Sequence, residues 1–257
     1  MNNQCIVNNE DLTAIADSIR TKTGVSEPLL FPNGFSDAIN GIQTGSAITN
    51  PYVEEIYDQN GKLVRVQLDG QTVLRDFLFY NCSELVNAEL QEGILTIGDS
   101  VFAKCSKLAN TSLPESITTI GSQAFYNCYE LALTSLPENL TTIGTSAFSC
   151  CAKIVFSSLP NNLTDIGVYA FSKCNGLTVV TFPVNLANIS DNAFYSCTGL
   201  TSITFKGTPN SISSTAFANC SKLATINVPW SEGIVANAPW GATNATINYN
   251  YVEEHTM

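Results

Sequence analysis

The chain has 257 residues, of which only 13% are charged, and 22 acidic against 11 basic residues give it a net charge of −11. Such an excess of acidic groups is repelled by the phosphates of nucleic acids and of anionic lipids, so the composition argues against nucleic-acid binding. No apolar run is long enough to span a membrane, and the first residues lack the basic and apolar regions of a secretory signal.

Residues 1–45 do not repeat any other part of the chain. Apolar residues at helical spacing follow Asn8 and Asn9, either of which would cap a helix: Leu12, Ile15, Ala16 and Ile19. A second short apolar turn runs over 35–42. The pattern predicts a small helical N-terminal module.

Three short stretches of this module have a recognisable sequence. The stretches 12–20, 22–24 and 31–35 read LTAIADSIR, KTG and FPNGF. Together they resemble an N-terminal module of phage and prophage tail-associated proteins, which implies attachment to a larger particle.

Residues 46–73 are expected to form a linker followed by a β-hairpin. The alternating stretches 52–57 and 62–68 flank Asn60 and Gly61, a dipeptide that favours a tight turn. A hairpin at this place would cap the open end of the array that follows.

A repeat of 23 residues occupies 74–228 in about seven copies. Phenylalanine recurs at this interval from Phe79 to Phe217, and cysteine recurs from Cys82 to Cys220. In one unit, a strand is expected over 108–113, followed by Pro114, a turn at Gly121, and a helical turn or irregular arc over 124–128. Stacking such units places like residues over like, which predicts a solenoid with one continuous core.

The repeat reads Leu-x-x-Ile-x-Phe/Leu-Pro-x-x-Leu-x-x-Ile-Gly-x-x-Ala-Phe-x-x-Cys and resembles the BspA-like, treponemal-type class of leucine-rich repeats. The resemblance implies an α/β repeat solenoid that is curved and carries one parallel β-sheet on its concave face. It also implies a bacterial cell-surface or secreted protein used in adhesion.

Seven of the nine cysteines share one column of the repeat. Stacked rungs hold parallel Cβ vectors about 4.8 Å apart, whereas a disulfide needs converging Cβ atoms about 3.8 Å apart. We therefore expect a buried, reduced ladder that packs as small apolar side chains. Cys5 and Cys150 are the two thiols that would react if exposed.

Residues 229–257 are expected to cap the C-terminal end. Trp230 and Trp240 are the only tryptophans of the chain, and they would seal the last rung. The alternative is a platform on which a sugar ring stacks, which requires an exposed indole.

Candidate catalytic residues are scarce. The only histidine, His255, lies near the C-terminus, which argues against histidine-dependent nucleophilic catalysis. Glu115 and Glu138 lie one rung apart and are interpreted as solvated turn residues rather than as a glycosidase pair. We therefore expect no enzyme, no cofactor and no metal site.

Outward-facing columns of the sheet give the candidate binding residues. One column is a ladder of hydroxyls, and its neighbour contains three consecutive apolar residues that would form an exposed stripe. The ladder comprises Ser112, Ser135, Ser158 and Thr181, and the stripe comprises Leu133, Phe156 and Val179.

We therefore expect a recognition or adhesion scaffold that binds a protein or glycan through its concave sheet. A structural spacer or assembly subunit with no ligand of its own is the alternative, and a carboxylate-based glycan hydrolase is a third. The expected location is the cell surface, the extracellular space or a virion. The oligomeric state stays open.

Overall fold

The structure is a computed structural model that describes residues 52–59, 61, 63–68 and 72–252. The expected helical module over 1–45 lies outside the described residues, as do the first residues of the linker. In the described part, no helix is long and apolar enough to cross a bilayer.

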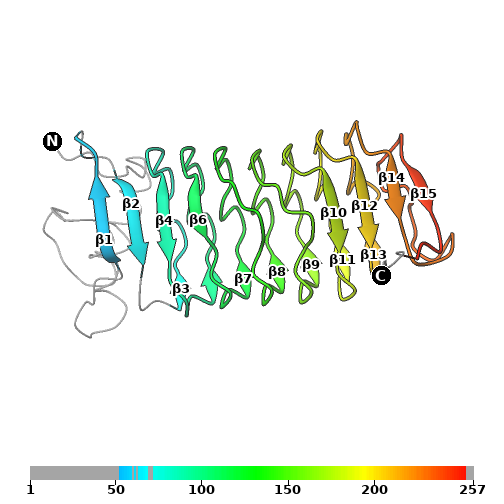
Figure 1. The fold of residues 1–257 in the computed structure, drawn as a ribbon, viewed down its shortest axis with the longest axis horizontal. Coiled ribbons are helices and arrows are strands. Elements are labelled where there is room, and N and C mark those ends of the chain that lie inside the picture. The colour runs from blue at the N-terminus through cyan, green and yellow to red at the C-terminus, as the bar shows by residue number, and fades with distance from the viewer. Residues whose placement is uncertain (1–51, 60, 62, 69–71, 253–257) are drawn as a thin grey trace, which may run out of the picture.

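Two four-stranded sheets lie along one side of an elongated solenoid (Figure 1). The first contains β1 (Tyr52–Tyr57), β2 (Leu63–Leu68), β4 (Asn87–Leu90) and β6 (Asn110–Ser112). The second contains β10 (Val179–Phe182), β12 (Ser202–Phe205), β14 (Thr225–Asn227) and β15 (Thr246–Asn248). Only β1 and β2 pair antiparallel, as the expected hairpin. We call the two sheets together the interrupted sheet, because two rungs without regular strands separate them.

A seven-stranded parallel sheet runs along a second side of the solenoid. Its members are two residues long and recur at the 23-residue interval: β3 (Val73–Leu74), β5 (Thr96–Ile97), β7 (Thr119–Ile120), β8 (Thr142–Ile143), β9 (Asp165–Ile166), β11 (Asn188–Ile189) and β13 (Ser211–Ile212). The expectation of one parallel sheet was therefore incomplete, since each rung contributes strand residues to two sides of the solenoid.

The arc after each short strand is a series of turns, and the described residues contain no helix. This corrects the α/β assignment for that part of the chain. Backbone N–H groups of the arc alternate between the next rung and their own turn, as from Phe102 to the carbonyl of Ala124 at 2.8 Å and from Ala103 to the carbonyl of Ser100 at 3.2 Å. Residues such as Gln123 and Asn127 adopt positive φ, which turns the backbone groups along the solenoid axis.

The core runs the length of the array. The seven phenylalanine rings of the column are buried, and each stacks on the next with centroids 5.2–5.4 Å apart. Trp240 follows Phe217 by one repeat length and accepts the Phe217 N–H at its carbonyl, 2.9 Å away, so the column continues into a further rung.

Both tryptophans belong to the end of the core. Trp240 and Trp230 are buried, their ring centroids lie 6.4 Å apart, and Phe205 packs against both. The interpretation as a sealing cap agrees with this burial, and the sugar-stacking alternative is wrong, because neither indole offers an exposed face.

Candidate recognition surface

The hydroxyl column lies on the outer face of the interrupted sheet, as the alternation of side chains along a strand predicts. Ser112, Ser135 and Ser158 are exposed, and Thr181 is half-buried. Ser158 joins Thr181 of the next rung through an isolated parallel bridge. The structure therefore presents these four residues one rung apart on a common face.

Amide side chains extend the column toward the C-terminal end. The Asn227 Nδ2 donates to Thr204 Oγ1 at 3.2 Å, and the Asn248 Nδ2 donates to Asn227 Oδ1 at 2.8 Å. Each bond links neighbouring rungs, so part of the polar capacity of this face is already satisfied within the protein.

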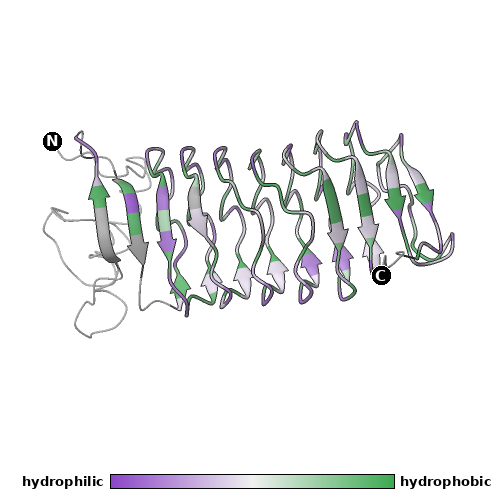
Figure 2. Ribbon diagram, in the orientation of Figure 1, coloured by the Kyte–Doolittle hydropathy of each residue, from purple (hydrophilic) through white to green (hydrophobic). Residues whose placement is uncertain are grey.

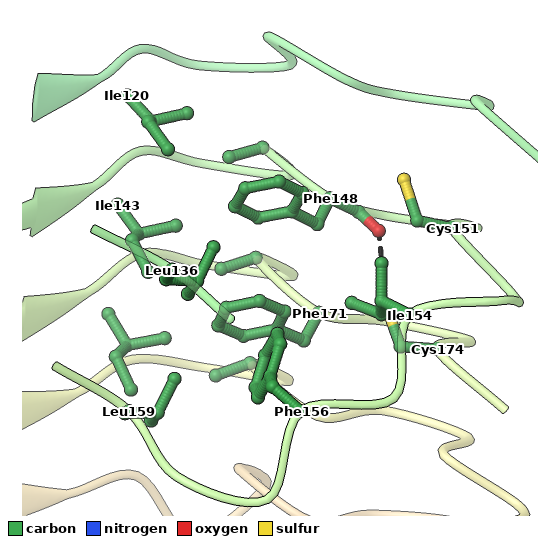
Figure 3. Packing of buried hydrophobic residues seen from close by; sticks show 14 of the residues in the cluster. Ile120, Leu136, Ile143, Phe148, Cys151, Ile154, Phe156, Leu159, Phe171 and Cys174 are labelled. Atoms are coloured by element: carbon green, nitrogen blue, oxygen red, sulfur yellow. Dashed lines mark hydrogen bonds between the residues drawn. The ribbon is translucent and has the colours of Figure 1, made fainter. Parts of the chain in front are cut away.

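The proposed apolar stripe does not exist. Leu133 and Phe156 are core residues with 5% and 2% of their surface exposed, whereas Val179 is 42% exposed. Phe156 packs edge-on against Phe171, with ring centroids 5.6 Å apart (Figure 3). The prediction of three exposed apolar residues was therefore wrong at two positions.

The reason is that, in two rungs, the residue that usually points inward is exposed and the residue before it is buried instead. In β4, β10, β12 and β14 the inward residue is apolar and buried: Ala88, Val180, Ile203 and Ile226. The equivalent residues of the two deviating rungs are Thr134 and Ser157, and both are exposed. A polar inward residue alone does not cause the exchange, because β6 keeps its register with Thr111 at this position, where the Thr111 hydroxyl donates to the Ala88 carbonyl at 2.6 Å. The two deviating rungs also carry a large apolar side chain, Leu133 or Phe156, directly before the polar residue, and its burial favours the exchanged register. A shift by one residue reverses the faces of a strand.

This exchange interrupts the sheet. Among the described residues, 131–137 and 154–160 contain no regular strand, and Ser158 forms their only bridge. Thr134 and Ser157 thereby join Ser135 and Ser158 on the outer face as two adjacent pairs of exposed hydroxyls. Sequence reasoning missed Thr134 and Ser157. The available signal was a polar residue at a position that most other units fill with an apolar one.

The outer face is free of charge over most of its length. The segments 110–113, 132–136, 155–159, 178–182, 201–205 and 224–228 contain no Asp, Glu, Lys or Arg. The Arg65–Glu89 ion pair lies at the N-terminal end of this face, on β2 and β4. In a chain of net charge −11, this is a distinct uncharged surface, mostly of hydroxyls and amides, with Val155 and Val179 as exposed apolar residues.

The carboxylates considered for glycosidase chemistry have a structural role instead. Glu92 accepts the backbone N–H of Glu115 at 3.0 Å, Glu115 accepts that of Glu138 at 2.7 Å, and Glu138 accepts that of Asn161 at 3.1 Å. These exposed turn residues therefore hold successive rungs together, which the sequence pattern did not reveal.

The cysteine column is mostly reduced, as expected, and it also forms hydrogen bonds. Each free cysteine of the column donates its S–H to the carbonyl of a phenylalanine on the preceding rung, as from Cys128 to Phe102 at 3.0 Å. Figure 3 shows the equivalent bond from Cys174 to Phe148, 3.1 Å long. Burial raises the pKa of the Cys105 thiol to about 12. The ladder thus supplies inter-rung donors as well as apolar volume.

Cys82 corrects the expectation of a fully reduced column. It is buried in the first rung and is disulfide-bonded, while every other described cysteine is free. Its bond does not join two stacked column residues, so the argument against disulfides within the ladder is unaffected. Cys150 is half-buried, with its Sγ 3.9 Å from Ser149 Oγ. No group of His, Cys, Asp and Glu within the described ranges is arranged to hold a metal ion.

Comparison with known proteins identifies the repeat. The BspA type leucine rich repeat region, with 6 copies, matches residues 56–174 and 151–238. The structure is similar to the T. pallidum leucine rich repeat protein, with 27% identity, a TM-score of 0.54, and coverage of 66% of this chain and 87% of that one. It is also similar to a leucine rich cell surface protein from Faecalibacterium prausnitzii, with 22% identity, a TM-score of 0.57, and coverage of 79% and 55%. No curated protein matches the chain.

Proposed function

Because the chain belongs to the BspA-type leucine-rich repeat family, we propose that it is a recognition scaffold without catalytic activity, which binds a protein or glycan partner through the interrupted sheet. The uncharged polar face is the observation that carries this proposal. Although the protein is acidic, this face carries no charged residue on successive rungs. Such a face suits a partner that is recognised without ion pairs. Exposed hydroxyls and amides match the donors and acceptors of a glycan or of a peptide backbone.

The location proposed for this scaffold is the bacterial surface. The F. prausnitzii structure is described as a leucine rich cell surface protein. A role in adhesion is proposed because the repeat resembles a class of leucine-rich repeats whose members are often used in adhesion. Attachment to a phage or prophage tail is a narrower proposal, and it is supported only by the resemblance of residues 12–35.

Binding to this face is testable with Ser135→Asp combined with Ser158→Asp. Both residues are exposed, so the double variant adds two charges to the face without disturbing the core. Thr142→Asp combined with Ser211→Asp is the matched control, since it adds the same two charges at residues exposed on β8 and β13 of the other sheet. The full chain is screened against a glycan array and a panel of immobilised extracellular proteins.

We expect at least one ligand whose affinity falls tenfold or more in the double variant and is unchanged in the control. No ligand above background, or equal weakening by both variants, would contradict the proposal. Circular dichroism of each variant confirms that the fold is intact.

A spacer or assembly subunit is the second candidate, and the open edge of β15 favours it. In the described part of the chain, β15 pairs only with β14 and ends the interrupted sheet. An exposed edge strand is a template for pairing with another chain. Light scattering that shows a concentration-dependent oligomer, abolished by Ile247→Pro in β15, would favour assembly over recognition.

A further inference from the structure

Three exposed apolar side chains lie on the first two rungs of the seven-stranded sheet. Val73 of β3, Phe77 after it, and Leu95 before β5 are 48%, 57% and 45% exposed. We call these three residues the first-rung patch.

The repeat supplies an internal control for the patch. In later rungs the Val73 column contains only polar residues, in register with one another: Thr96, Thr119, Thr142, Asp165, Asn188 and Ser211. The Leu95 column, bonded backbone to backbone, begins with Thr72 and continues after Leu95 with Thr118, Thr141, Thr164, Ala187 and Asn210. The change is visible in Figure 2, where β3 is hydrophobic while β9 and β11 are hydrophilic. The Val73 column is thus polar on every later rung and apolar only on its first, which indicates that this end is covered.

The same end of the seven-stranded sheet is open. β3 is its terminal strand, and no described residue pairs with the outer edge of β3. The interrupted sheet differs, because the β1–β2 hairpin closes its N-terminal end. A solenoid needs a cap over each end, and the described residues supply a capping hairpin for the interrupted sheet but no strand on the edge of β3.

Cys82, in the first rung, is disulfide-bonded. Its disulfide partner is not among the seven free described cysteines, and the sequence contains nine cysteines in all. The remaining cysteine is Cys5. In the sequence, fifty-one residues precede β1, the first strand of this end.

We propose that residues 12–42 cover the first-rung patch and the open edge of β3, held in place by a disulfide between Cys5 and Cys82. The apolar positions Leu12, Ile15 and Ile19 recur at helical spacing and need an apolar surface to pack against. About ten residues connect this segment to β1, which is enough to span about 33 Å when extended, or roughly three times the spacing of packed sheets. The segment thus completes the N-terminal cap.

Limited trypsin digestion of the full chain tests this docking, since Arg20 and Lys22 are cleavage sites within the segment. The test variant combines Val73→Thr, Phe77→Ser and Leu95→Thr, which are the residues found in neighbouring rungs, so the solenoid tolerates them. Val184→Thr is the matched control, because Val184 is an exposed apolar residue of a distant rung. Protein is refolded with oxidised glutathione, which accepts the two electrons released as two thiols form the disulfide.

We expect cleavage after Arg20 and Lys22 to be at least tenfold faster in the triple variant than in the wild type, with the control unchanged. We also expect a Cys5–Cys82 linked peptide in a non-reducing digest. Equal cleavage rates would overturn the docking, and a free Cys82 thiol would overturn the tether. A wild-type dimer that the triple variant converts to a monomer would assign the patch to a second copy instead. None of these readouts depends on a ligand of the interrupted sheet.

Discussion

Phe148 shows how much one buried ring contributes to the array. It is fully buried and lies between Phe125 and Phe171, with centroid separations of 5.3 and 5.4 Å and nearly parallel planes. Phe148→Ala removes contacts to both neighbouring rungs and leaves a cavity, so we expect a loss of about 3–5 kcal/mol in the free energy of unfolding.

Urea denaturation followed by circular dichroism measures this loss. Tyr129→Ala is the control, since Tyr129 is exposed and its removal should change stability by less than about 0.5 kcal/mol. An unchanged midpoint for Phe148→Ala would mean that the ring column does not carry the core.

At the scale of the rung, Phe156 and Val179 occupy equivalent positions of the repeat but opposite environments. Phe156 lies in the core, and Val179 lies on the outer face of β10. We expect Phe156→Ala to cost about 3–5 kcal/mol and Val179→Ala to cost less than about 0.5 kcal/mol.

Urea denaturation of the two variants checks this contrast directly. Similar costs at both positions would show that the rung containing Phe156 keeps the ordinary strand register. The same burial means that Phe156→Asp would be more damaging still, because it places an unpaired carboxylate in the core.

The sequence predicted the rungs well and their local register less well. A period of 23 residues determines which side chains stack, because any drift would break the phenylalanine and cysteine columns at once. It does not determine which side chain within a rung turns inward. In the two deviating rungs a large apolar residue, Leu133 or Phe156, precedes a polar one at the usual inward position, and burial of the apolar side chain favours the exchanged register. A motif written for the average unit does not contain this pair of residues.

The candidate surface was predictable in part for the same reason. Ser112, Ser135 and Ser158 are exposed because their position is polar in every unit. The cysteine S–H bonds and the Glu92, Glu115 and Glu138 turn contacts depend on distances between rungs. A linear pattern gives no such distances.

For the whole molecule, the buried thiol column predicts a loss of stability in alkaline solution. Burial raises the thiol pKa of Cys105, Cys128, Cys151, Cys174 and Cys197 above the usual value of 9.0. A raised pKa in the folded state means that folding favours the protonated thiol. The stabilisation is complete below about pH 9, and it is lost as the pH rises toward the folded-state values, because the unfolded chain releases these protons first.

Each such thiol lowers the free energy of unfolding by up to about 1.4 kcal/mol per pH unit in this range. Denaturation curves at successive pH values above 9 measure the slope, and Cys128→Ala, which removes one thiol, should reduce it by up to that amount. The slope is the decisive quantity, since it is insensitive to the constant loss of stability that the substitution causes at every pH. Equal slopes in the wild type and in Cys128→Ala would show that these thiols ionise as readily in the folded array as in the unfolded chain.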